Sequence, residues 1–305
     1  MERKVDMTIA VIGSVFMEYT YNIPRIPLAS EVLTAKSMLS REGGRGQNQA
    51  VTMAKLEGDI KMIGMVGEDE GGEICLNSMK RYGIDTSGVF IKGEVRTGEK
   101  IIYIDDNGET NSVVYPGATR SITVEDLPKI YELLEGVDAV LLQFELPFEV
   151  ILPILKHCHE QNIQTFVNPA PASQDFDASY LKYVDYLIPN EIELFFTVHN
   201  EIKTHKIEEA CKKIDELGCH NIIVTLGQEG SIYYNGEEFT KIPAEEVAGK
   251  DGKCVGDSFV GTFVIGITTG METIEAIKYA TKAAAITLSN KGGYSALPYK
   301  KDIEK

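Results

Sequence analysis

Short apolar stretches alternate with helical patterns along almost the whole chain, and this alternation constrains the fold more than any other feature. Stretches with strand character lie at residues 5–13, 60–66, 139–143, 164–168 and 221–226, and helical periodicity fills most of the intervals between them. Parallel strands need long crossover connections, which are usually helical. The sequence therefore predicts an α/β fold, with a doubly wound, mostly parallel sheet flanked by helices.

Two segments interrupt this alternation. Residues 14–42 contain prolines and short extended patterns without helical periodicity. Residues 97–120 contain a hairpin pattern, in which two apolar runs flank Asp106-Asn107-Gly108. We expect the two segments to pair into a small β-sheet that lies off the main sheet.

Composition narrows the class of partner and the compartment. The formal net charge is −16, which opposes nonspecific binding to nucleic acid or to an anionic membrane. The cysteines number five and form no Cys-x-x-Cys pair, so a disulfide framework is not expected. No apolar run approaches the roughly 20 residues that a membrane-spanning helix needs. We expect a cytoplasmic protein that binds a small molecule.

Residues 249–270 read as a glycine-containing loop that enters an apolar helix. Unpaired N–H groups at a helix start attract anions, and the small residue Gly256 would let an anion approach closely. Asp257 then fits a general base beside an anion site, or simply an acidic residue in the first turn of a helix. Cys254 fits either a reactive thiol or a small packed side chain.

A second glycine-rich turn lies at residues 43–48, where Arg45 and Asn48 supply hydrogen-bond donors. It matches neither the dinucleotide-binding fingerprint nor a P-loop. On its own this turn is either a ligand contact or a structural turn.

Asn190 and Glu193 follow the strand expected at residues 186–189 and are three residues apart. At a helix start they would face the same side, either to hold phosphate and Mg²⁺ or to cap the helix reciprocally. Another strand ends at Thr225, before a turn that contains Gly227 and Gly230.

Taken in order, these segments resemble the ribokinase family of carbohydrate kinases, also called the PfkB family. The resemblance rests on Gly13-Ser14, the glycine-rich turn at 43–48 with Gln49-Ala50 after it, residues 66–69, residues 189–193, Thr225-Leu226-Gly227 and Gly256-Asp257. It covers nearly the whole chain. It implies one ribokinase-like domain over residues 1–305, whose lid is formed by about 14–42 and 97–120, and a homodimer that forms through this lid.

The resemblance also implies an ATP-dependent sugar kinase, which transfers the γ-phosphoryl of ATP to a primary hydroxyl. Asp257 would be the general base, and the N–H groups of Cys254, Val255, Gly256 and Asp257 itself would form an anion hole for the transferring phosphoryl. The sugar would lie against Phe16, Glu18, Gly43, Gly44, Arg45, Asn48 and Glu145. ATP would lie against Asn190, Thr225, Gly227, Gly230 and Gly256, with Mg²⁺ organised by Glu193. A K⁺ site would use Asp251, the backbone carbonyl of Lys253, and carbonyls near Thr287, Asn290 and Gly292.

The chain departs from the family pattern just after the first strand. Phe16 and Glu18 stand where ribokinases place an Asn and an Asp that bond the sugar hydroxyls. Because a phenyl ring cannot hydrogen-bond a hydroxyl, the departure favours a deoxypentose or another substituted furanose over ribose. Two alternatives remain open: a nucleoside kinase of the same fold, and a non-catalytic relative that binds sugar or nucleotide.

Overall fold

A nine-stranded sheet runs through the centre of the molecule. The computed structural model describes residues 7–198, 206–249 and 252–304. The strand order is β13-β12-β11-β10-β9-β8-β1-β4-β5, parallel except where β12 meets β11 and β13. The strands are β1 (Thr8–Ile12), β4 (Asp59–Gly67), β5 (Asp85–Lys92), β8 (Ala139–Gln143), β9 (Gln164–Asn168), β10 (Tyr186–Leu187), β11 (Asn221–Thr225), β12 (Ser231–Tyr234) and β13 (Phe239–Ile242). The predicted α/β class is confirmed.

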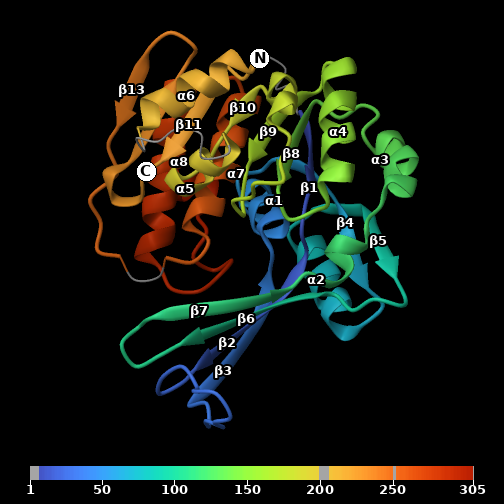
Figure 1. Cartoon of the computed structure of the whole chain (residues 1–305), viewed down its shortest axis with the longest axis vertical. Helices are drawn as coiled ribbons and strands as arrows, with labels where there is room; N and C mark the ends of the chain where they lie inside the picture. The colour runs from blue at the N-terminus through green and yellow to red at the C-terminus, as the bar shows by residue number, and fades with distance from the viewer. Residues whose placement is uncertain (1–6, 199–205, 250–251, 305) are drawn as a thin grey trace.

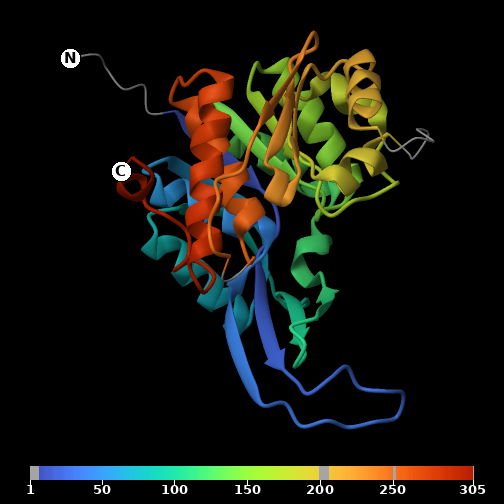
Figure 2. The same ribbon diagram turned by 90° about the vertical axis from the view of Figure 1, so that its left-hand side faces the viewer.

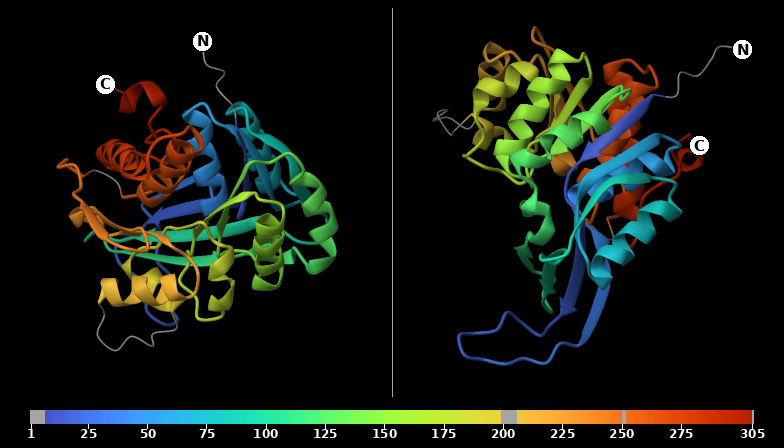
Figure 3. Two further views of the ribbon diagram at one scale, coloured as in Figure 1. Left: turned by 90° about the horizontal axis from the view of Figure 1, so that it is seen from above. Right: turned by 90° about the vertical axis from the view of Figure 1, so that its right-hand side faces the viewer.

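Helices cover both faces of this sheet (Figure 3, left). One face packs against α1 (Arg45–Lys55), α2 (Glu70–Arg81), α7 (Val255–Thr268), α8 (Thr273–Ser289) and α9 (Lys300–Ile303). The other packs against α3 (Leu127–Leu133), α4 (Phe148–Glu160), α5 (Glu191–Thr197) and α6 (Ile207–Glu216). Apolar side chains that alternate along each strand therefore enter two separate cores.

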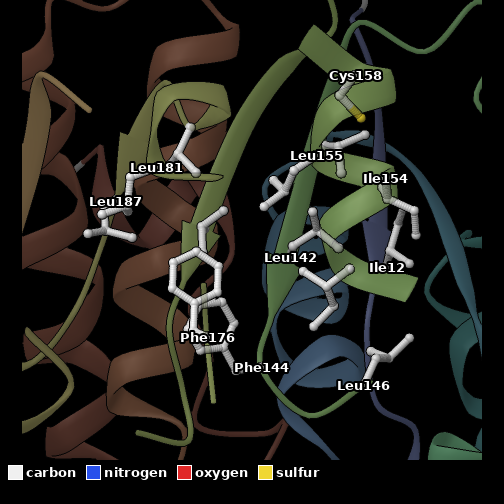
Figure 4. Packing of buried hydrophobic residues seen from close by; sticks show 14 of the residues in the cluster. Ile12, Leu142, Phe144, Leu146, Ile154, Leu155, Cys158, Phe176, Leu181 and Leu187 are labelled. Atoms are coloured by element: carbon white, nitrogen blue, oxygen red, sulfur yellow. The ribbon is translucent and has the colours of Figure 1, made fainter. Parts of the chain in front are cut away.

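The core under α4 is rich in aromatic contacts. Phe144, just after β8, stacks on Phe176 with ring centroids 4.7 Å apart, and both rings are buried (Figure 4). Leu142 and Ile154 fill the space between β8 and α4 in the same cluster. This packing fixes the end of β8, from which Glu145 follows directly.

The two interrupting segments pair as predicted. They form a four-stranded sheet in the order β3-β2-β6-β7, made of β2 (Phe16–Asn22), β3 (Ser37–Gly43), β6 (Gly98–Ile104) and β7 (Thr110–Tyr115). We call this sheet the lid. It extends as an arm from the α/β body, and the loop between β2 and β3 forms its tip (Figures 1 and 2).

Sequence patterns did not reveal β5. This strand is the edge of the main sheet, and its pairing with β4 shifts register between Lys61 and Ile63. An edge strand is partly exposed to solvent, so its sequence can contain polar residues. The polar start of β5 and Gly88 therefore leave no continuous apolar run that would have predicted a strand. Short 3-10 turns complete the fold at Gly117–Ser121, Val124–Asp126, Ala178–Tyr183 and Gly227–Glu229.

In the part of the chain that the structure describes, no helix is both long and apolar enough to cross a membrane.

Candidate active site

A cavity of about 690 Å³ lies between the inner face of the lid and the carboxyl ends of the central strands. Ligands of open α/β sheets bind at this edge. The predicted residues that line it are Phe16, Glu18, Gly44, Arg45, Asn48, Glu145, Lys253, Cys254, Val255, Gly256 and Asp257. The fold thus brings together side chains that are as far as 241 positions apart (16 to 257) in the sequence.

Asp257 lies in the first turn of α7 and is only 8% exposed. Its Oδ2 accepts a hydrogen bond from Asn48 Nδ2 at 2.8 Å, and its Oδ1 accepts one from Gln49 Nε2 at 3.0 Å. Burial raises the pKa of this carboxyl above its ordinary value, whereas the charge of Arg45 and the two amide bonds act in the opposite direction. The carboxylate is therefore held in place, with lone pairs left for a further donor.

The start of α7 has N–H groups of the kind that the predicted anion hole requires. The first intrahelical bond of this turn runs from Ser258 N to the Cys254 carbonyl at 2.8 Å, so Val255, Gly256 and Asp257 have no carbonyl within the helix for their N–H groups. Gly256 is exposed, and a Cβ placed there would meet no atom within 4 Å. The space next to these donors is open for an anion.

Cys254 caps this helix in a left-handed conformation, with φ of 59°. That backbone region favours glycine and costs other residues about 1 kcal/mol or more. A residue other than glycine therefore occupies a left-handed position directly before the first turn of α7.

Glu145 and the turn before α1 form a second polar cluster. Glu145 Oε2 accepts hydrogen bonds from the Ser14 hydroxyl and from Arg45 N, the latter at 3.2 Å. Burial raises the pKa of Glu145, and the charge of Arg45 opposes that rise. Gly44 makes the turn possible, because its φ is 93° and a Cβ would lie 2.8 Å from the Ser14 carbonyl.

Arg45 places the main positive charge among these acids. Burial lowers the pKa of its guanidinium, but the charges of Asp257, Glu145, Glu193 and Glu18 reverse the direction, so the net pKa is raised. No hydrogen bond from this guanidinium to another described residue accompanies these charges. Arg45 therefore retains donors for a ligand that lies among these carboxylates.

Phe16 and Glu18 project from β2 toward the cavity. Phe16 is 2% exposed, and its ring lies against the backbone of Gly98, where a Cβ would be 2.2 Å from the ring. Glu18 Oε2 accepts two hydrogen bonds from Arg41, from Nη2 at 2.6 Å and from Nε at 2.9 Å. Gly43 leaves room for this carboxylate, since a Cβ there would lie 2.5 Å from Glu18 Cδ.

The sequence reasoning missed Arg41 and Lys100, which also line the cavity. Both are register partners of Glu18, Arg41 on β3 and Lys100 on β6, so the three side chains share one face of the lid. The strand pairing that creates this row is not readable from local patterns. Arg41 and Lys100 could have been identified only if the register between β2, β3 and β6 had been known.

Asn190 and Glu193 form a reciprocal cap at the start of α5. Asn190 Oδ1 accepts from Glu193 N at 2.9 Å, and Glu193 Oε2 accepts from Asn190 N at 2.8 Å. The capping alternative thus describes their local geometry. Burial raises the pKa of Glu193, and Arg45 acts against the rise, which places Glu193 within the electrostatic reach of the site.

Thr225 lies beside Asn190 through a parallel bridge, at the carboxyl end of β11. Gly227 and Gly230 both have positive φ, at 58° and 92°. A Cβ on Gly230 would lie 2.1 Å from the Ile242 carbonyl, whereas one on Gly227 would meet nothing within 4 Å. Packing alone thus requires glycine at 230. These residues do not line the cavity, and they flank it at the neighbouring strand ends.

Three of the candidate K⁺ positions, Thr287, Asn290 and Gly292, lie around the end of α8, whereas Lys253 lies just before α7. Asp251 is outside the described residues. Thr287 is buried, and its carbonyl accepts from Asn290 N at 3.2 Å. Gly292 follows with φ of 102°. Within the described ranges, no group of three or more His, Cys, Asp or Glu side chains converges as a metal cluster.

Comparisons with known proteins identify the family. The sequence matches the pfkB family carbohydrate kinases over residues 6–300. A ribokinase of Lactococcus lactis is 32% identical over 298 residues, which cover 97% of this chain and 95% of the relative. A deoxyribokinase of Salmonella typhi is 29% identical over 293 residues, with 96% of each chain covered. The structure of Arabidopsis thaliana ribokinase complexed with ribose and ATP has a TM-score of 0.87 at 25% identity, with 98% of each chain covered. This chain therefore belongs to the pfkB family of carbohydrate kinases, phosphotransferases whose acceptor is an alcohol group.

Proposed function

We propose that this kinase transfers the γ-phosphoryl of ATP to a primary hydroxyl of a pentose or deoxypentose, with Asp257 as general base. The observation that carries the proposal is the position of Asp257. It is a buried carboxylate in the first helical turn, next to three N–H groups that open onto the cavity. Phosphoryl transfer needs a group that orients and deprotonates the attacking hydroxyl, and donors for the developing charge; this turn has residues suited to both roles.

In the proposed reaction, Asp257 accepts the proton of the attacking sugar hydroxyl. The hydroxyl oxygen bonds to the γ-phosphorus as the bond between this phosphorus and the β–γ bridging oxygen breaks, and ADP leaves. Val255, Gly256 and Asp257 donate their N–H groups to the transferring phosphoryl, and Arg45 adds positive charge. Asn48 Oδ1 is buried without a hydrogen-bond partner among the described residues, so it is available to accept from a sugar hydroxyl. Glu145 fixes the loop that holds Arg45.

ATP would lie along the strand ends marked by Asn190, Thr225, Gly227 and Gly230, and reach the anion hole at Gly256. Glu193 fits a role toward Mg²⁺, because its Oε2 is used in the cap while its Oε1 has no hydrogen bond to the described residues. Carboxylate oxygen is a ligand of the chemical type that Mg²⁺ prefers, directly or through water. When bound, Mg²⁺ would neutralise phosphate charge. A K⁺ ion is proposed on the same basis of oxygen donors, which would be the backbone carbonyl of Lys253 and carbonyls near Thr287, Asn290 and Gly292.

Phe16 favours a deoxypentose as the acceptor. Its ring is buried in the cavity wall and offers nothing to a hydroxyl, so a sugar hydroxyl placed there would lose its bonds to water. Glu18 is paired with Arg41 and is therefore already partly satisfied. Both a ribokinase and a deoxyribokinase are among the similar proteins. The preference for a deoxypentose is therefore proposed from this wall alone.

We expect Asp257→Asn to lower kcat by about 10² or more while ATP binding is retained, because the amide cannot take the proton. ADP release is measured with ribose, 2-deoxyribose, fructose and nucleosides, with and without K⁺. In the unmodified enzyme, kcat/KM should fall with decreasing pH, starting above the range of an exposed aspartate, because burial raises the pKa of Asp257.

Full turnover by Asp257→Asn would refute the assignment of the base. ATP or sugar binding without any ADP formation would instead identify a non-catalytic relative. Activity confined to nucleosides would identify the nucleoside kinase.

A further inference from the structure

A chain of buried side-chain amides lies behind Asp257. It joins α1, β8, β9 and the residue after β10 through Gln49, Gln143, Asn168 and the Ile188 carbonyl. Gln49 and Gln143 are fully buried, and Asn168 is 6% exposed. Buried amides are costly unless their bonds are satisfied, so the arrangement restricts how each group is oriented.

The direction of every bond follows from one end of the chain. The Ile188 carbonyl can only accept, so Asn168 must turn its Nδ2 toward it, at 2.8 Å. Asn168 Oδ1 then faces Gln49 and accepts from its Nε2 at 3.1 Å. Gln143 Nε2 donates to Gln49 Oε1 at 2.7 Å, which agrees with the same orientation.

As a result, Gln49 can present only its N–H₂ group to Asp257, and the bond to Oδ1 is 3.0 Å long. A donor that cannot be exchanged for an acceptor favours the ionised carboxylate. Gly13 permits the arrangement, because a Cβ there would lie 2.0 Å from Gln143 Oε1.

We propose that Gln49 is a positioning residue for the reaction: held by Gln143 and Asn168, it fixes the orientation of the Asp257 carboxylate and keeps it ready to accept a proton. This inference rests on the proposed role of Asp257 as base. Gln49 does not line the cavity and need not touch the sugar. Because Asn168 bonds to Ile188, two residues before Asn190, the same chain ties the base to the strand end proposed for ATP.

Gln49→Glu is the sharpest test, since it preserves volume and the acceptor for Gln143 but replaces the N–H donor by oxygen. We expect the acid limb of the kcat/KM profile to move up by about one pH unit or more, with kcat reduced about tenfold near neutral pH and the Kd for ATP within about twofold. Gln49→Met removes the donor without adding charge and should shift the limb in the same direction by less.

Gln47→Met is the matched control. Gln47 lies two residues earlier on α1 and is equally buried, but its amide has no hydrogen-bond partner among the described residues. The acid limb of the kcat/KM profile of Gln47→Met should lie at the same pH as that of the unmodified enzyme. Thermal melting shows whether Gln49→Glu and Gln49→Met are folded. The pH profile is then measured on each variant that melts cooperatively.

An unchanged limb in a folded Gln49 variant would overturn the inference, even if kcat falls, because a purely structural role predicts loss of rate without a pH shift. Asp257→Asn separates this from failure of the proposed function. If Asp257→Asn is inactive while the Gln49 limb is unchanged, only the inference about Gln49 fails.

Discussion

Phe16 places an apolar ring in the cavity lining. Its ring is held by close contact with Gly98 and by burial, so it cannot swing away to make room for a hydroxyl. The neighbouring acid is also restrained, because Glu18 bonds to Arg41 through a side chain that is itself largely buried. If this wall reads the sugar, as we propose, it does so with side chains that their contacts hold in place.

Phe16→Asn should raise the ratio of kcat/KM for ribose to that for 2-deoxyribose by about tenfold or more, because a buried amide can bond the additional hydroxyl. Phe16→Leu keeps the wall apolar and serves as the control, with the ratio nearly unchanged. The ratio is obtained from initial rates of ADP release at subsaturating sugar. Equal ratios in all three proteins would show that Phe16 does not read this hydroxyl.

At the scale of elements, the turns at the carboxyl ends of strands are built under different constraints. The turn between β11 and β12 uses two glycines, but only Gly230 is enclosed by other backbone, against the Ile242 carbonyl. Gly227 has a left-handed φ and open space around its α-carbon. The same glycine-rich pattern thus contains one position fixed by packing and one that a ligand can approach.

Gly230→Ala should lower the free energy of unfolding by more than about 2 kcal/mol, because the added methyl group meets backbone and the residue must keep a glycine conformation. Gly227→Ala should cost about 1 kcal/mol, the strain of a left-handed alanine alone. Urea denaturation of both proteins gives the comparison. If Gly227→Ala is as destabilising as Gly230→Ala, then packing against Ile242 does not explain the requirement for glycine.

At the scale of the whole molecule, the lid has two faces with different surroundings. Its inner face covers the cavity and includes the row of Arg41, Glu18 and Lys100. By the alternation of strand side chains, the outer face carries Tyr21 and Tyr103, whose rings are 6.1 Å apart, beside Met38 and Val113. Met38 and Val113 are 55% and 62% exposed. An apolar sheet face of this kind favours contact with a second lid.

We therefore expect a homodimer that forms through the outer faces of two lids. Val113→Glu and Met38→Glu should each shift the protein toward monomer, because a carboxylate would be buried at the contact. Val124→Glu places the same charge on a residue that is 52% exposed outside the lid and should leave the dimer intact. Sedimentation velocity over a range of concentrations measures the three variants. A monomeric parent protein at every concentration would contradict this assembly.

Much of the fold was predictable because its determinants are local. Apolar strands, helix starts and hairpin turns depend on near neighbours, and their order identified the sheet, the lid and the turns at Gly44 and Gly256. The edge strand β5 was not predicted, since its local pattern is weak and its pairing with β4 compensates for that weakness. The positions of Arg41, Lys100 and Gln143 in or beside the site were not predicted for a related reason, because the residues that they pair with lie on other strands or helices.

The loop before α7 separates the two kinds of information. The sequence by itself determined that Gly256 and Asp257 stand at a helix start where an anion can approach, because dipole and unpaired N–H groups are properties of any helix terminus. Only the tertiary structure decided that Asp257 is buried and bonded on both oxygens by α1, and that Glu18 is paired with Arg41. Those features come from contacts between segments distant in the chain, and the chemistry of a buried charge depends on all the groups that surround it.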